Sequence, residues 1–305
     1  MKILITGGTG LIGRSLSKTF HDQGHDLIVL TRNPRKAKPL QRYNAHLISN
    51  FDQIDKNEKI DIVINLAGEP IANKRWTKDQ KRKIWKSRIE TTTKLVELIG
   101  RLSVAPKVLI SGSAVGYYGD CGDRKLNELS NPHDEFSHQL CAAWEMQAVR
   151  AKAFNTRVCI LRTGLVLANN DGFLKKMLPS FKLGLGATLG NGKQWMSWIH
   201  INDFINIIHF LLKNESLSGV FNAAAPNPVT NKIFTKSLGS ALRRPTLFVM
   251  PGFMLKKMFG EMSTLLLTGQ RVIPEKLLKA RFEFAFPTLD VALENVLKKS
   301  RPKGL

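Results

Sequence analysis

Acidic residues, cysteine and tyrosine are all scarce in this chain. Its 305 residues include 24 Asp and Glu against 46 Lys and Arg, which leaves a formal net charge of +22 at pH 7. A field this positive favours anionic partners, namely nucleotides, nucleotide sugars, nucleic acid or an acidic surface, and does not choose among them.

The three cysteines, Cys121, Cys141 and Cys159, are odd in number and widely spaced. This spacing matches neither a disulfide framework nor a metal site, so we expect no metal and a reducing, cytoplasmic setting. No apolar run reaches the roughly 18 residues of a spanning helix, so no membrane partner is expected. The glycines at positions 7, 8 and 10 also predict that the first residues are not a secretion signal.

Short apolar segments alternate with helical patterns through the first half of the chain. Strands are predicted at 1–6, 26–30, 45–48, 61–66, 106–111 and 157–162, and helices at 11–23, 78–102 and 136–153. This order predicts an α/β fold with a Rossmann-type, doubly wound parallel sheet. Ligands of such sheets bind at the carboxyl ends of the strands.

After Gly164 the pattern becomes a smaller, mixed α/β arrangement. Helices are predicted at 173–183, 203–212, 230–242, 253–267, 275–279 and 288–299, and strands at 220–223 and 246–250. Asn202 and Asp203 are expected to cap the helix that runs to Leu212.

The stretch TGGTGLIGRS, residues 6–15, follows the first strand and opens the first helix. Gly7 permits the tight turn, Gly10 lets a pyrophosphate approach the backbone, and Gly13 lets the helix pack against the sheet. The helix N-terminus adds N–H groups and a positive dipole end. The motif predicts dinucleotide binding; the alternative is a structural glycine-rich turn.

The end of the second strand, Leu30-Thr31-Arg32-Asn33, has no carboxylate for a ribose 2′-hydroxyl. The Arg32 guanidinium instead matches a 2′-phosphate, so NADP(H) is predicted over NAD(H). A solvated loop arginine is the alternative. We therefore predict an NADP-binding Rossmann domain at 1–165, with 199–213 packing back on it, and a smaller C-terminal substrate domain made of 166–198 and 214–305.

Several motifs together resemble a known family. They are the glycine turn, Asn65-Leu66-Ala67-Gly68, SGSAVGYYG (111–119), Arg75-Trp76, Ser87–Glu90, Trp144-Glu145, RTGLVL (162–167), LGLG (183–186), QWMSWIHIND (194–203), NAAAPNPVTN (222–231), QRVIPEKLL (270–278) and FAFPTL (284–289). The chain resembles the extended short-chain dehydrogenase/reductases of the NAD(P)-dependent epimerase/dehydratase group. More narrowly, it resembles the YfcH-like epimerase-family proteins, including their C-terminal domain of unknown function. The resemblance runs from Met1 to about Leu297.

The resemblance implies an NADP(H) site. It places Thr9, Gly10, Leu11 and Ile12 at the diphosphate, Thr31 and Arg32 at the adenosine ribose and its phosphate, Leu66, Ala67 and Gly68 along the groove, Arg88 toward the cofactor, and Ser111 and Ser113 near the nicotinamide.

Hydride chemistry in the wider superfamily uses a Tyr and a Lys four residues later on one helix, because the Lys lowers the pKa of the Tyr. Ser113 matches the serine that accompanies this pair. The tyrosines are Tyr43, Tyr117 and Tyr118, and none has a Lys four residues on. Aligning on Glu145 puts Ser137 and Cys141 where the pair is expected.

Two functional hypotheses remain open. Tyr117 or Tyr118 serves as a substitute acid in an epimerase or oxidoreductase acting on an unidentified nucleotide sugar or small carbonyl compound. Otherwise the chain is a catalytically weak NADP(H)-binding sensor or scaffold. The tyrosines also have a structural interpretation, in which their rings pack under a loop.

A dense basic stretch, KRWTKDQKRKIWKSR at 74–88, raises a third hypothesis. It holds eight Lys or Arg against one Asp, as nucleic-acid-binding segments do. Nucleic acid is the less favoured partner, because a long amphipathic helix often carries Lys on its solvated face. The helices at 78–102 and 136–153 leave both a homodimer and a monomer open.

Overall fold

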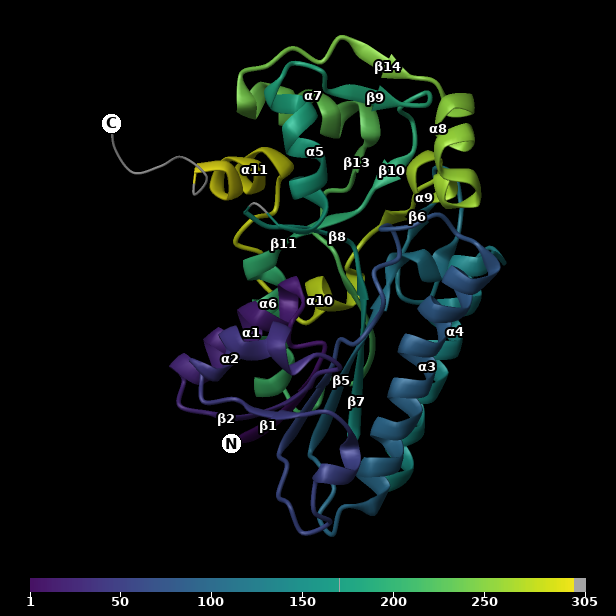
Figure 1. The fold of residues 1–305 in the computed structure, drawn as a ribbon. Coiled ribbons are helices and arrows are strands. Elements are labelled where there is room, and N and C mark those ends of the chain that lie inside the picture. The colour runs from purple at the N-terminus through teal and green to yellow at the C-terminus, as the bar shows by residue number, and fades with distance from the viewer. Residues whose placement is uncertain (170, 299–305) are drawn as a thin grey trace.

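A computed structural model describes residues 1–169 and 171–298, so the predicted helix end at 299 lies outside the described residues. Its centre is a parallel seven-stranded sheet in the order β12-β7-β5-β4-β1-β2-β3 (Figure 1). The strands are β1 (Lys2–Thr6), β2 (Asp26–Leu30), β3 (His46–Ile48), β4 (Ile62–Asn65), β5 (Val108–Ala114), β7 (Arg157–Thr163) and β12 (Gly219–Ala223). This confirms the predicted doubly wound, Rossmann-type sheet.

Helices cover both faces of this sheet. One face carries α1 (Leu11–Asp22), α2 (Pro34–Gln41) and α6 (Ile201–Lys213), and the other carries α3 (Lys78–Arg101) and α4 (Phe136–Val149) (Figure 1). Each layer has its own apolar core, because side chains of alternate strand residues point to opposite faces. Ile3 and Ile5 pack toward α1 and α6, whereas Leu4 packs toward α3.

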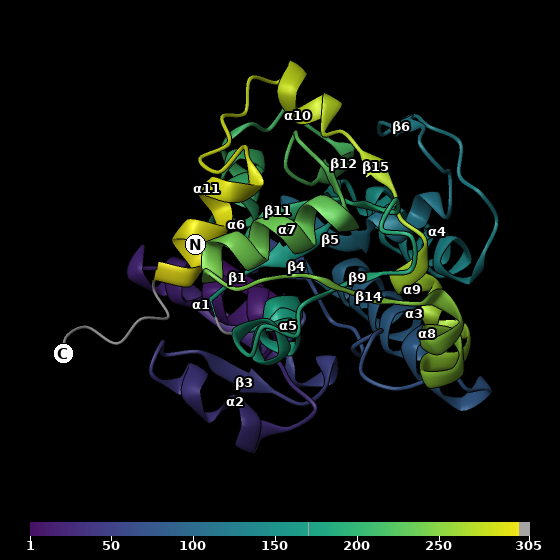
Figure 2. The ribbon, with the colours of Figure 1, turned by 90° about the horizontal axis from the view of Figure 1, so that it is seen from above.

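A smaller lobe lies beyond the carboxyl ends of these strands (Figures 1 and 2). Its core surrounds Trp198, which is fully buried. Its elements are α5 (Gly172–Lys182), α7 (Asn231–Leu242), α8 (Gly252–Phe259), α9 (Thr264–Leu267) and α11 (Leu289–Lys298), with the short strands β6 (Lys125–Leu126), β8 (Leu165–Leu167), β9 (Ala187–Leu189), β10 (Trp195–Met196), β11 (Trp198–His200), β13 (Val229–Thr230), β14 (Phe248–Met250) and β15 (Arg271–Val272). The short helix α10 (Glu275–Lys279) packs instead against β12, with Leu277 in the core of the main sheet.

Two predicted boundaries differ from the structure. β12 falls in the segment 214–305 that the sequence places in the smaller domain, but it pairs with β7 as the edge strand of the main sheet. The rest of the proposed division stays a prediction. The helix predicted at 253–267 is broken after Phe259, because Gly260 takes a φ of 59° that a continuing α-helix does not allow.

The cap of α6 also differs from the prediction. His200 is the N-cap, and its Nδ1 accepts from the Asn202 N–H at 3.1 Å. Asp203 is fully buried, and its two oxygens accept the N–H groups of Ala285 and Phe286 at 2.9 and 3.0 Å. The carboxylate that was expected to cap a helix instead fastens a distant C-terminal segment to it.

Among the described residues, no helix is both long and apolar enough to cross a membrane. Nor do any three His, Cys, Asp or Glu side chains in that part of the chain form a group suited to a metal ion.

We predict that Asp203→Ala lowers the free energy of unfolding by about 2 to 4 kcal/mol, because two N–H groups lose a fully buried, charged acceptor. Urea unfolding measures the change. Asp22→Ala is the control, because this exposed acid forms a surface ion pair with Lys18 whose loss costs about 0.5 kcal/mol or less. Equal losses in the two variants would contradict the prediction.

Candidate functional site

The glycine turn joins β1 to α1 at the carboxyl end of the sheet. Gly7 has a φ of 72°, and a Cβ there would lie 2.5 Å from the Leu66 carbonyl oxygen. A Cβ on Gly13 would lie 2.3 Å from the carbonyl oxygen of Gly7. Gly10 is exposed, and a Cβ on it would approach only that same carbonyl, at 3.3 Å. Two glycines are therefore required by packing, while Gly10 leaves the backbone open to a ligand.

The N-terminus of α1 is suited to an anion. Gly10 is its N-cap and offers no side-chain acceptor, and the first turn of this fully described helix has no acidic residue. The first N–H groups of a helix lack intrahelical partners and carry the positive end of its dipole. Thr9, Leu11 and Ile12 are partly exposed beside them. The predicted diphosphate residues thus lie together.

Asn65, at the end of β4, links the end of β1 to the middle of β5 and to helix α3. Its Oδ1 accepts from Thr6 Oγ1 at 2.7 Å, and its Nδ2 donates to Thr92 Oγ1 at 2.8 Å and to Ser111 Oγ at 3.2 Å. Thr6 Oγ1 in turn accepts the Ala67 N–H at 3.1 Å. Ser111 is fully buried, so its hydroxyl serves this network.

Arg32 lies at the carboxyl end of β2, as predicted. Its side chain is 79% exposed, and its one ion pair within the described chain is a 3.5 Å contact to Glu69. Thr31 beside it is buried, with its Oγ1 accepting the Asn33 N–H at 3.2 Å. The guanidinium is thus held loosely over the edge of the sheet, where an anionic group can reach it.

Arg88 reaches the same region from α3. Its Nη1 donates to the carbonyl oxygens of Glu69 and Ile84 at 3.0 and 3.2 Å, and its guanidinium lies 5.3 Å from the centre of the Trp144 ring. Burial lowers the pKa of Arg88. A Cβ on Gly68 would lie 2.8 Å from the Arg88 Cζ, so a side chain there would displace the guanidinium from the β4 loop.

Ser113 sits at the end of β5 beside a buried ion pair. Its Oγ donates to Glu145 Oε1 at 2.6 Å. Arg162 from β7 holds both oxygens of that carboxylate, with Nε and Nη2 each at 2.9 Å. Burial opposes the charge of Arg162, but its hydrogen bonds and attraction to Glu145 prevail and raise its pKa. The pair fixes the direction of the Ser113 hydroxyl.

The two candidate tyrosines occupy different surroundings. Tyr118 is fully buried; its hydroxyl donates to Asn222 Oδ1 at 2.7 Å and accepts from Arg162 Nη1 at 3.1 Å. Burial raises the pKa of Tyr118 to about 12. Tyr117 is partly exposed, and its ring lies on the Arg162 guanidinium at 3.3 Å. Tyr118 therefore has the features of a packed structural residue, and Tyr117 remains open to a ligand.

A family model described as the NAD dependent epimerase/dehydratase family matches residues 3–224, which include the glycine turn, Arg88 and Ser113. The chain belongs to that family. A second model, a domain of unknown function named DUF1731, matches residues 250–296. These matches confirm the resemblance seen in the sequence motifs.

Individual proteins that are similar to this chain also carry the name of the epimerase family. The chain is 37% identical over 305 residues to the chloroplastic epimerase family protein SDR39U1 homolog of Arabidopsis thaliana, covering 98% of this chain and 87% of the relative. It is 36% identical over 299 residues to epimerase family protein YfhF of Bacillus subtilis, covering 97% and 98%. The crystal structure of human epimerase family protein SDR39U1 with NADPH matches with a TM-score of 0.89 and 32% identity, over 98% of this chain and 99% of that one.

Ser137 and Cys141, the residues at the positions where the sequence predicts the Tyr and Lys pair, are both buried on α4. A Cβ on Gly116 would lie 3.2 Å from Ser137 Cβ, so Ser137 packs under the loop that carries the tyrosines. Burial raises the pKa of Cys141 to about 11. Neither side chain exchanges protons near neutral pH.

Most residues of the buried network are not among the site residues that the sequence predicts. Glu145 serves there only to align the helix, and Arg162, Asn222 and Glu128 are absent from the predicted site. Glu128 Oε1 accepts the Asn222 N–H at 3.0 Å, and Asn222 Nδ2 donates to the Ile273 carbonyl at 3.0 Å. One signal was present: an arginine inside the apolar strand RVCILRT requires a buried partner.

We predict that Tyr118 makes the folded state sensitive to alkali. Its folded pKa, about 12, lies above the ordinary value of about 10, so the stability it contributes is fully present below pH 10 and is lost as pH rises through 12. Between pH 9 and 12 the native chain should lose about 2 kcal/mol more unfolding free energy than Tyr118→Phe. Urea unfolding at matched pH measures this, and parallel losses in the two proteins would contradict it.

Proposed function

We propose that this chain binds NADP(H) and acts as an epimerase- or oxidoreductase-like enzyme on an unidentified nucleotide sugar or small carbonyl compound. The observation that carries the proposal is the open N-terminus of α1 beside Gly10, with Arg32 in place of a carboxylate at the end of β2. The NADPH in the human relative's structure supports it. When bound, the nicotinamide supplies a hydride donor or acceptor.

The residues present fit such a dinucleotide. Gly10 leaves room for a diphosphate at the α1 N-terminus, and the exposed Arg32 guanidinium suits a 2′-phosphate. The proposed holding set is Gly7, Thr9, Gly10, Leu11, Ile12 and Gly13 at the diphosphate, Thr31 and Arg32 at the ribose phosphate, Leu66, Ala67 and Gly68 along the groove, Arg88 toward the cofactor, and Ser113 on the β5 side. Ser111, the other β5 residue predicted there, is fully buried and supports this set through Asn65.

The direction of the Ser113 hydroxyl limits its role. Its proton is directed at Glu145, whose carboxylate is held in place by Arg162. Toward a ligand, Ser113 therefore offers lone pairs and accepts a hydrogen bond. A serine that polarises a carbonyl must donate instead. We infer that the group placed against Ser113 is an alcohol or amide donor.

Tyr117 is the proposed proton-exchanging residue. Its ring is held between the Arg162 guanidinium and the His138 ring, whose centre lies 5.0 Å away. His138 Nδ1 lies 2.7 Å from the Tyr117 backbone carbonyl oxygen, which further fixes the turn. Partial exposure leaves the phenol accessible, whereas the Tyr118 hydroxyl is enclosed.

We predict that Arg32→Asp weakens NADPH binding about 10- to 100-fold, because a charge-assisted hydrogen bond to the 2′-phosphate is replaced by repulsion. NADH affinity should change by no more than about threefold. Titration of nicotinamide fluorescence measures both. Arg42→Asp, the same charge change beside the Tyr43 ring, is the control. Parallel weakening of both cofactors would overturn the assignment of NADP(H).

We predict that Tyr117→Phe lowers NADPH oxidation with a panel of nucleotide sugars and small carbonyl compounds by about 100-fold or more, the usual range for a lost general acid. NADPH affinity should be retained. Tyr43→Phe, on the far side of the sheet from Arg162, is the control and should keep full turnover. Unchanged turnover in Tyr117→Phe would remove this residue from the chemistry.

A second function, an NADP(H)-binding sensor or scaffold, is favoured by Ser137 and Cys141, which do not titrate near neutral pH. The panel of nucleotide sugars and small carbonyl compounds separates the enzyme from the sensor or scaffold. Tight NADPH binding without turnover of any compound would support the sensor, and absence of NADPH binding would overturn both.

A further inference from the structure

Six large apolar side chains are exposed together at the outer end of the small lobe. Leu247, Phe253 and Val249 are 84%, 71% and 62% exposed. We call the group the apolar tip; its members are Leu247, Phe248, Val249, Phe253, Met254 and Met258. It lies on β14 and α8, at the opposite end of the molecule from the N-terminus (Figure 1). Large apolar side chains that are exposed so close together along the chain mark an interaction surface.

The local structure explains why these side chains stay uncovered. β14 pairs with β9 in a two-stranded sheet, which runs across the outer end of the lobe toward α8 (Figure 2). Phe248 and Val249 point to opposite faces of that strand, yet both are exposed. α8 buries Leu255 alone among its residues and turns Phe253, Met254 and Met258 outward.

Basic residues border the apolar tip on one side. Lys256 and Lys257 are exposed on α8 itself. Arg75, from the basic stretch 74–88, donates to the carbonyl oxygens of Lys257 and Met258 at 2.6 and 2.5 Å. Lys81 pairs with Glu261 at 2.6 Å. The basic stretch singled out in the sequence is therefore fastened to α8 and continues its charged surface along α3.

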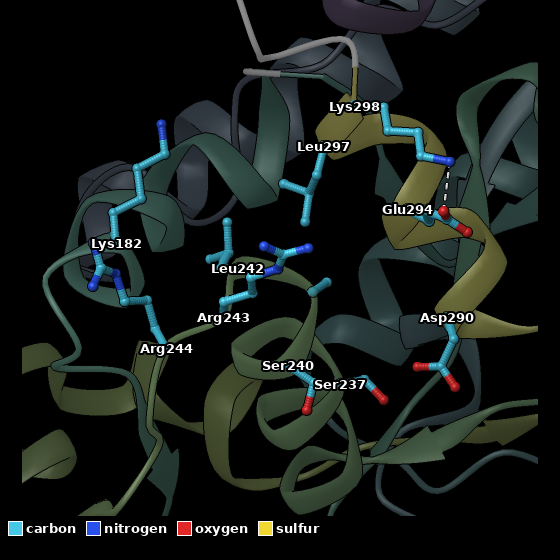
Figure 3. A pocket seen from close by; sticks show the side chains of 11 residues that line it. Lys182, Ser237, Ser240, Leu242, Arg243, Arg244, Asp290, Glu294, Leu297 and Lys298 are labelled. Atoms are coloured by element: carbon cyan, nitrogen blue, oxygen red, sulfur yellow. Dashed lines mark ion pairs between the residues drawn. The ribbon is translucent and has the colours of Figure 1, made fainter.

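Cations also border the opposite end of β14. Arg243 and Arg244, which come a few residues before β14 in the chain, are exposed. With Lys182 they line one side of a cavity of about 750 Å³, across from Asp290 and Glu294 (Figure 3). The mixed charges of the cavity do not single out an anion site within it. Lys182, Arg243 and Arg244 do extend the basic border around the apolar tip.

We propose that the apolar tip and its basic border dock this protein on an anionic lipid surface. Apolar side chains of an amphipathic helix insert at the level of the headgroups, while flanking Lys and Arg attract anionic lipid. The net charge of +22 strengthens that attraction at long range. The sequence predicts no membrane partner because it has no spanning segment. Docking on a lipid surface needs no such segment.

Charge decides between this occupant and two others. A second copy docked on the same face would bring two sets of Lys256 and Lys257 into one interface, and the added like charges oppose such pairing. Nucleic acid would satisfy the cations but would leave Leu247, Val249 and the methionines uncovered. An anionic lipid layer matches both parts of the surface, because its acyl chains cover the apolar tip and its headgroups pair with the basic border. The proposal is independent of the cofactor and of any turnover.

Flotation of the full chain with vesicles tests the proposal. We expect binding to phosphatidylcholine vesicles that contain about one third phosphatidylglycerol, and little binding to phosphatidylcholine alone. The double variant Leu247→Ser/Phe253→Ser should bind at least about tenfold more weakly, because two exposed anchors are lost. Leu129→Ser is the control, because Leu129 is 90% exposed away from the apolar tip. Unfolding midpoints should be unchanged in both.

The charged border is tested separately. Lys256→Glu/Lys257→Glu should weaken binding to the anionic vesicles by about tenfold, whereas Lys59→Glu, a single exposed change far from α8, should weaken it much less. Failure to bind anionic vesicles, or equal weakening by Leu129→Ser, would overturn the proposal. Two other results would overturn the proposal. One is a dimer that forms without lipid and is abolished by Leu247→Ser/Phe253→Ser. The other is binding of single-stranded RNA, without lipid binding, that the same double variant abolishes.

Discussion

The buried ion pair between Glu145 and Arg162 is the interaction on which the candidate site depends. It joins α4 to the end of β7, sets the direction of the Ser113 hydroxyl, and supports the rings of both Tyr117 and Tyr118. Breaking such a pair leaves an uncompensated buried charge, which costs about 3 to 5 kcal/mol. The geometry of the site and the stability of the fold are therefore coupled through one contact.

The same pair connects the main sheet to the C-terminal segment. Arg162 contacts the Tyr118 hydroxyl, Tyr118 donates to Asn222, and Asn222 donates to the carbonyl of Ile273. Asp203 provides a second connection, because its carboxylate holds the N–H groups at 285 and 286. The region matched by DUF1731 is thus fastened to the site by buried polar contacts rather than by apolar packing alone.

The sequence predicted those features that local rules determine. Strand and helix alternation follows from apolar periodicity, and the roles of Gly7 and Gly13 follow from the close approach of helix and sheet. It could not predict that Asp203 bonds residues 82 and 83 positions away, because nothing local distinguishes that acid from a cap. Nor could it separate Tyr117 from Tyr118: adjacent residues in the same motif differ only in what the rest of the fold packs around them.

The charges buried around position 141 explain why a cysteine, and not the lysine expected from the alignment on Glu145, fits there. Position 141 is fully enclosed, close enough to Arg88 and Glu145 for both charges to affect its thiol. A lysine there would add a cation beside Arg88, while the nearby carboxylate is already held at both oxygens by Arg162. Burial and repulsion would then oppose its charge together. Cys141 avoids that conflict, because burial raises the pKa of its thiol and keeps it neutral.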